Sequence, residues 1–174
     1  DEASDIDFFI VTAPRRVWLV RFFTNIILKI TRQRVSTLHA ANKICLSFYA
    51  DNEHLNLAKF RIAPSDVYLI YWFITLLPVY DPENMHAQII RANGWLSEYV
   101  PTAFSLIVIR PGFTPRRRSW WLIAWEAMWR GSYGSIIEKE TRRIQESFFS
   151  PALKRAAQAG VVGVVIDEGI LKFH

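Results

Sequence analysis

The sequence has a single cysteine, few glycines and no long uncharged apolar run. With Cys45 alone, an intrachain disulfide framework is excluded, which favours a reducing compartment such as the cytoplasm. The longest uncharged apolar run, residues 67–80, falls short of the roughly 20 residues that a membrane-spanning helix needs. Neither a G-x-S-x-G motif nor a Gly-rich P-loop occurs, so serine-hydrolase and Walker-type chemistry have no support. We expect a cytoplasmic protein without a transmembrane segment.

Apolar residues and positive charge are what the sequence does have. Of its 174 residues, 51% are hydrophobic and 14% aromatic, enough for a folded core. The formal net charge is +5, and the largest basic cluster lies in residues 110–118. A basic surface attracts phosphate groups of nucleotides, nucleic acids or lipids without choosing among them.

Apolar patterns predict a strand at 6–13, a helix at 14–33 and a second strand at 43–50. Helices follow at 64–77 and at 81–100, the latter capped by Asp81 with Pro82 as its first residue. A further helix at 135–149 places Ile137, Ile144 and Phe148 on one face, and residues 161–174 form a closing strand. Within that helix, Glu138 and Arg142 are spaced as a supportive pair. The predicted fold class is α+β, with an α/β core at 1–62 and a mainly helical region at 63–174.

Two aspartates, Asp5 and Asp7, stand at the mouth of the first strand. Residues i and i+2 of a strand share a face, so the two carboxylates lie side by side, with Ile6 turned to the core. Such a pair repels itself unless a cation lies between, and Mg²⁺ prefers oxygen ligands of this kind. A solvated loop before the strand is the plainer alternative.

The stretches "ASDIDFFIVT", "RRVWLVRFF", "NKICLSFYADNEHLNL" and "SDVYLIYWFITLLPVYD" carry a resemblance to a known family, and "NGWLSEYVP" and "VVIDEGILKFH" add to it. The chain resembles the nucleotidyltransferase superfamily related to DNA polymerase β, in particular its bacterial nucleotidyltransferase-domain proteins. That family's motif also has a Gly-Ser turn upstream of D-x-D, which is not among the residues before Asp5.

The resemblance implies a transfer from an NTP, such as ATP, to a hydroxyl of an unknown acceptor. Asp5 and Asp7 would then hold Mg²⁺ or Mn²⁺. Independently of the resemblance, Ser4, beside Asp5, and Arg117 and Arg118 of the basic loop are the candidates for contacting the nucleotide. A third carboxylate usually completes the family's site, and Asp51 is the first acid available after the second strand. A turn or cap aspartate is the alternative for Asp51.

A second hypothesis keeps the scaffold and loses catalysis, leaving a binding or regulatory module. It is motivated by the second strand, whose central candidates Cys45, Ser47 and Tyr49 include no carboxylate. The four histidines show no metal-binding spacing and are interpreted as ordinary surface or partly buried residues. Nucleic acid is not excluded as a partner.

Two further segments allow more than one interpretation. Arg110, Arg116, Arg117 and Arg118 lie in a Pro- and Gly-containing loop that binds either polyphosphate or, as we favour, solvent or a partner. In segment 119–131, Trp121, Trp125 and Trp129 recur every four residues, which predicts one aromatic helix face. A membrane-interface helix, a base-stacking platform and a protein-partner contact are alternatives to packing on the helical half, which we favour.

Overall fold

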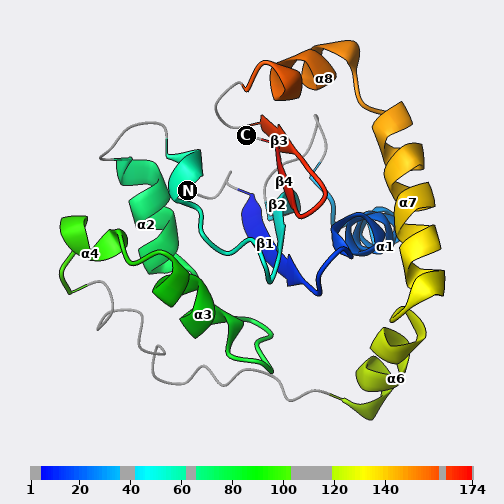
Figure 1. Cartoon of the computed structure of the whole chain (residues 1–174), viewed down its shortest axis with the longest axis horizontal. Helices are drawn as coiled ribbons and strands as arrows, with labels where there is room; N and C mark the ends of the chain where they lie inside the picture. The colour runs from blue at the N-terminus through cyan, green and yellow to red at the C-terminus, as the bar shows by residue number, and fades with distance from the viewer. Residues whose placement is uncertain (1–4, 36–41, 62–65, 103–118, 161–163, 174) are drawn as a thin grey trace. The chain divides into compact units, whose positions relative to one another are not determined.

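The computed structural model describes residues 5–35, 42–61, 66–102, 119–160 and 164–173 (Figure 1). Its fold is α+β, as the sequence predicts. The strands are β1 (Ile6–Thr12), β2 (Ile44–Asp51), β3 (Val164–Ile166) and β4 (Ile170–Phe173). The helices are α1 (Val17–Ile30), η1 (Ala58–Phe60, a 3₁₀ turn), α2 (Val67–Thr75), α3 (Met85–Ala92), α4 (Leu96–Tyr99), α6 (Trp120–Met128), α7 (Ser132–Ser147) and α8 (Pro151–Gln158).

The four strands form one sheet in the order β1-β2-β4-β3. β1 and β2, which lie close to the strands predicted at 6–13 and 43–50, are parallel neighbours. β4 is antiparallel to both β2 and β3. The expected single strand at 161–174 is a hairpin in the described residues, because Asp167–Gly169 turns the chain and the Asp167 N–H donates to the carbonyl of Ile170.

The hydrophobic core of this part of the chain lies between α1 and the sheet. Val17 and Trp18, in the first turn of α1, are almost fully buried against Tyr49 of β2 and Leu171 of β4. The first turn thus fixes α1 to two strands at once. The expected helix at 14–33 is shorter at both ends, since the chain turns through Ala13–Arg16 with Arg15 at a positive φ.

Helix α7 packs on α1 with a polar face, contrary to the predicted apolar one. Its buried residues are Gly134, Glu138, Thr141 and Gln145, whereas Phe148 is 83% exposed. The polar face is buried because the N–H groups that open α1 need acceptors, and the carboxylate of Glu138 supplies them. Glu138 therefore does not pair with Arg142, which instead binds Glu146 and Glu168.

The chain divides into two compact units, and the division differs from the expected boundary at residue 62. One unit comprises residues 1–54 and 128–174, and the other comprises residues 55–127. The C-terminal segment belongs with the N-terminal one because β4 pairs with β2 and α7 packs on α1. Local sequence patterns do not predict that the C-terminal segment packs against the N-terminal one.

In the unit at 55–127, the expected helix at 81–100 consists of α3 and α4, separated by a turn at Asn93–Trp95. Asp81 still accepts hydrogen bonds from the N–H groups of Met85 and His86, so its predicted capping role is retained from outside the helix. Asn93 is fully buried and is bonded to the backbone of Leu55 and Leu57. The Asn93 side-chain amide thus links the turn at Asn93–Trp95 to the backbone at the start of this unit.

Candidate metal centre

Asp5, Asp7 and Cys45 form a group that we term the carboxylate–thiol cluster. One carboxylate oxygen from each aspartate and the thiol sulfur all lie within 4.8 Å of one another. The strand register accounts for this arrangement, since Asp7 pairs with Cys45 across the parallel β1–β2 ladder. Asp5 and Cys45 are partly buried and Asp7 is exposed, so the cluster is open to solvent on one side.

The same-face prediction for Asp5 and Asp7 is consistent with these distances, but the prediction for Ile6 is wrong. Ile6 is 50% exposed, because it lies at the start of an edge strand rather than over the core. Beyond Asp7, β2 contains one more residue than β1, a β-bulge that shifts the register before Phe9 pairs with Phe48. The pairing of Asp7 with Cys45 thus lies before the bulge, on its N-terminal side in both strands.

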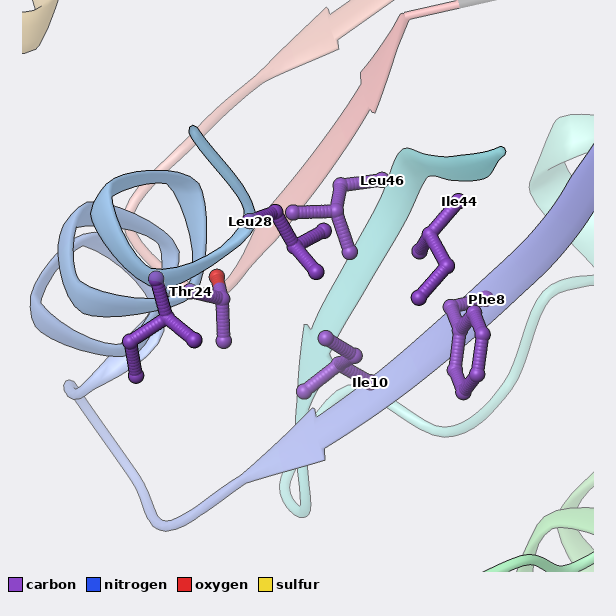
Figure 2. A pocket seen from close by; sticks show the side chains of 7 residues that line it. Phe8, Ile10, Thr24, Leu28, Ile44 and Leu46 are labelled. Atoms are coloured by element: carbon purple, nitrogen blue, oxygen red, sulfur yellow. The ribbon is translucent and has the colours of Figure 1, made fainter. Parts of the chain in front are cut away.

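The face of β1 that points toward α1 has a different chemistry. Figure 2 shows side chains of β1, β2 and α1 converging on a hollow of about 180 Å³. Its lining is apolar apart from Thr24, whose hydroxyl is within hydrogen-bond distance of the Val20 carbonyl and the Tyr49 hydroxyl. A triphosphate needs donors and cations, so this hollow does not fit one. The residues that line the hollow are Phe8, Ile10, Thr24, Ile27, Leu28, Ile44 and Leu46.

Two further side chains near the hollow, Tyr49 and Arg21, are buried or half-buried. Burial raises the pKa of the Tyr49 phenol to about 12. Burial also lowers the pKa of the Arg21 guanidinium to about 10, and Arg21 donates to the side chain of Gln145 at 2.6 Å. Both groups are thus held inside the fold in their ordinary protonation states at neutral pH.

Asp51 is not brought together with Asp5 and Asp7. It pairs with Thr12 at the far end of the ladder, six residues from Cys45 along β2, or about 20 Å at the rise of a strand. Its side chain is 1% exposed and accepts from the backbone N–H groups of Arg15 and Glu53. The N-terminal ends of parallel strands lie together at one end of the ladder, and their C-terminal ends lie together at the other. Asp51 is therefore no third ligand for an ion held by the cluster.

Cys45 is the neighbour that sequence reasoning did not place beside the aspartates. Its position follows from the parallel pairing of the two strands, which local patterns do not specify. Two carboxylate oxygens fit Mg²⁺ or Mn²⁺, whereas a thiol suits softer ions. The donor set therefore fits a hard ion through Asp5 and Asp7, with Cys45 as a neighbour rather than a preferred ligand.

The remaining nucleotide-contacting candidates, Ser4, Arg117 and Arg118, lie outside the described residues, as does the rest of the basic loop. The Trp-rich segment is described, and it departs from the expected aromatic face. α6 ends at Met128, so Trp129 lies beyond it and packs on Phe23. Trp121 and Trp125 are 67% and 50% exposed, so neither is buried as the favoured packing predicts.

Comparisons with family models, with curated proteins and with solved structures found no match for this chain. Within the parts of the chain that the structure describes, no helix is both long and apolar enough to cross a membrane.

Proposed function

We propose that the chain is a Mg²⁺- or Mn²⁺-dependent nucleotidyltransferase that transfers a nucleotidyl group from an NTP, such as ATP, to an acceptor hydroxyl. The observation that carries the proposal is the proximity of the Asp5 and Asp7 carboxylates on one face of β1. β1 is followed by a helix and a parallel strand, the order that the family resemblance implies. In this proposal the reaction takes place in the cytoplasm, where NTPs are available.

In this proposal Asp5 and Asp7 hold the ion, which neutralises charge on the triphosphate when bound. The acceptor oxygen attacks the α-phosphorus while its proton passes to solvent, and pyrophosphate leaves with the electrons of the broken P–O bond. Ser4, Arg117 and Arg118 are the candidates for contacting the nucleotide, because hydroxyl and guanidinium groups suit phosphate oxygens. Asp51 takes no part in this site, because it lies at the other end of β2. The acceptor is a small molecule, a protein side chain or a nucleic-acid end.

One observation favours a second candidate, a binding or regulatory module without catalysis. The residue that stands beside Asp7 on the neighbouring strand is Cys45, where a carboxylate could have activated the acceptor hydroxyl. In the described residues, the group of possible ligands around Asp5 and Asp7 contains no third carboxylate. Such a module would bind a metal–nucleotide complex and release no pyrophosphate.

The exposed apolar side chains of α6 add a partner surface to either candidate. Four of them, Trp120, Trp121, Leu122 and Ile123, are between 41% and 67% exposed. Exposed apolar groups gathered in this way mark interaction sites. We propose that this part of segment 119–131, helix α6, contacts a protein partner.

Metal binding tests the proposal directly. We expect Mn²⁺ titrated in the presence of ATP to bind the wild-type chain. Asp5→Asn with Asp7→Asn should weaken this binding by roughly tenfold or more, since losing even a residue that only orients a metal ligand typically costs about 10- to 100-fold. Asp167→Asn, an exposed aspartate in the β3–β4 turn, is the matched control and should bind as wild type does. Unchanged binding in the double variant would show that the site is wrong.

Pyrophosphate release separates the two candidates. An enzyme releases pyrophosphate from ATP in the presence of a suitable acceptor, and the double variant does not. A chain that binds Mn²⁺–ATP through Asp5 and Asp7 and releases none across small-molecule, protein and RNA acceptors is the binding module.

A further inference from the structure

Asp51 and His54, which we term the Asp–His pair, lie at the carboxyl end of β2. The Nδ1 atom of His54 is 2.5 Å from Oδ1 of Asp51. Asp51 is 1% exposed, whereas the His54 side chain is 42% exposed. A buried carboxylate thus holds one nitrogen of an imidazole whose ring remains accessible to solvent.

The backbone around the pair fixes its geometry. Asp51 accepts from the N–H groups of Glu53 at 3.1 Å and Arg15 at 3.3 Å, and its own N–H donates to the Gly169 carbonyl. Gly169 packs so closely that a Cβ there would overlap Nδ1 of His54 and lie 2.9 Å from Oδ2 of Asp51. Three separate segments, the turns after β1 and β2 and the β3–β4 hairpin, therefore converge on the pair.

This contact determines which nitrogen of His54 is available. A carboxylate on Nδ1 favours the tautomer that carries its proton there, leaving a lone pair on Nε2. Among the residues that the structure describes, Nε2 has no hydrogen-bond partner. Capping of the turn explains why Asp51 is buried, but it needs no imidazole held in one tautomer.

The surroundings indicate the kind of ligand. The pair lies where the parallel strands β1 and β2 end, the edge at which α/β sheets bind ligands. The neighbouring Arg15 is exposed, and its guanidinium has no hydrogen-bond partner in the described part of the chain. Its backbone N–H donates to Asp51, so an unpaired cation is attached to the same turn. An anionic ligand matches that charge.

We propose that the Asp–His pair is a ligand-binding site, separate from the carboxylate–thiol cluster, that takes a small phosphorylated compound bearing a hydroxyl group. The hydroxyl group of the ligand donates a hydrogen bond to Nε2 of His54, and Asp51 is the positioning residue that fixes the tautomer. Arg15 binds the phosphate. The site does not depend on the proposed nucleotidyl transfer, because it lies at the opposite edge of the β1–β2 pair.

Acylation of histidine by diethyl pyrocarbonate, quantified by peptide mass spectrometry, measures how reactive the ring is. We expect His54 to be acylated faster than the other three histidines, and inorganic phosphate to protect it. Asp51→Asn should slow the acylation roughly tenfold. Asp167→Asn, the matched change in the adjoining turn, should not. A reactivity equal to that of a peptide of residues 51–54 would overturn the proposal, and absence of phosphate protection would overturn its anionic ligand.

A second measurement does not depend on whether Asp51→Asn folds. Long-range ¹H–¹⁵N correlation spectra of the wild-type chain report the tautomer of each neutral imidazole. The proposal requires the Nδ1–H form at His54. A spectrum showing mainly the Nε2–H form would overturn it whatever the variants do.

Discussion

At the residue scale, backbone contacts that exclude a side chain are the sharpest constraints in this fold. Gly134 is buried in the first turn of α7, and a Cβ there would overlap the carbonyl oxygen of Trp129 and lie 3.1 Å from a nitrogen of Arg16. The same Arg16 guanidinium donates to the carbonyls of Trp129 and Gly131. Gly134 thus permits Arg16 to hold the turn between α6 and α7.

We expect Gly134→Ala to lower the free energy of unfolding by about 3 kcal/mol, because backbone rather than a mobile side chain must move. Gly94→Ala is the matched control. A Cβ at Gly94 meets only the Arg91 carbonyl at 4.0 Å, so its effect should stay within about 0.5 kcal/mol. Urea unfolding of both variants measures the difference. Equal effects would show that the approach of Gly134 to Trp129 is not as close as described.

At the element scale, α1 depends on α7 for its N-terminal cap. The residue before α1, Arg16, makes no side-chain capping bond. Glu138 instead accepts from the N–H groups of Trp18 at 3.0 Å and Leu19 at 2.7 Å. A carboxylate at a helix N-terminus satisfies these donors and is favoured by the helix dipole. One helix therefore completes another that lies more than a hundred residues earlier in the chain.

Glu138→Gln keeps the shape of the side chain and replaces one acceptor with a donor that faces an N–H group. We expect it to lower the free energy of unfolding by about 2 kcal/mol. Burial raises the pKa of the Glu138 carboxyl above its ordinary 4.5, against the opposite effect of the two N–H donors. The folded state then binds the proton more tightly than the unfolded state, so wild-type stability falls as pH rises through that window.

Urea unfolding across that pH window, on wild type and Glu138→Gln, checks both statements. The difference between the two free energies of unfolding should shrink as pH rises, since the glutamine does not titrate. A difference that grows with pH would mean that the two N–H donors outweigh burial at this carboxyl.

The sequence predicts those elements that are determined by neighbouring residues, and it fails for features that depend on packing between distant segments. β1, α1 and β2 are encoded by local apolar runs and by Pro14, and all three form close to the expected positions. The buried face of α7 was predicted wrongly, because Ile144 and Phe148 suggest an apolar stripe. Glu138 is buried instead, since its carboxylate accepts hydrogen bonds from the first N–H groups of α1. That requirement becomes visible only when the two helices are packed together.

At the scale of the whole molecule, long-range pairing decides what the sites contain. The spacing of Asp5 and Asp7 was sufficient to place them side by side. The register of β2 against β1 was not predicted, and it is this register that brings Cys45 to Asp7 and takes Asp51 to the opposite end of the strand pair. His54 was interpreted as an ordinary histidine, although its position three residues after Asp51 in a turn was the available signal.

The two units of the chain carry titratable groups that act in opposite directions. In the unit at 55–127, burial lowers the pKa of the His86 imidazole below its ordinary 6.5, and nearby Asp81 only partly offsets this. The Nε2 atom of His86 is buried without a hydrogen-bond partner in the described structure. Below 6.5 the unfolded chain then binds more protons than the folded one, so this unit loses stability as pH falls.

We expect acidification below pH 6.5 to lower the urea midpoint of the unit that contains His86, as followed by NMR signals of Ile89 and Ile90. Signals of Tyr49 and Leu171, in the other unit, are the internal control, because the raised pKa of Glu138 acts there in the opposite sense. His86→Phe removes the titrating group and should abolish the acid sensitivity of Ile89 and Ile90. If that variant remains as acid-sensitive as wild type, or if both sets of signals shift together, the burial of His86 is not the cause.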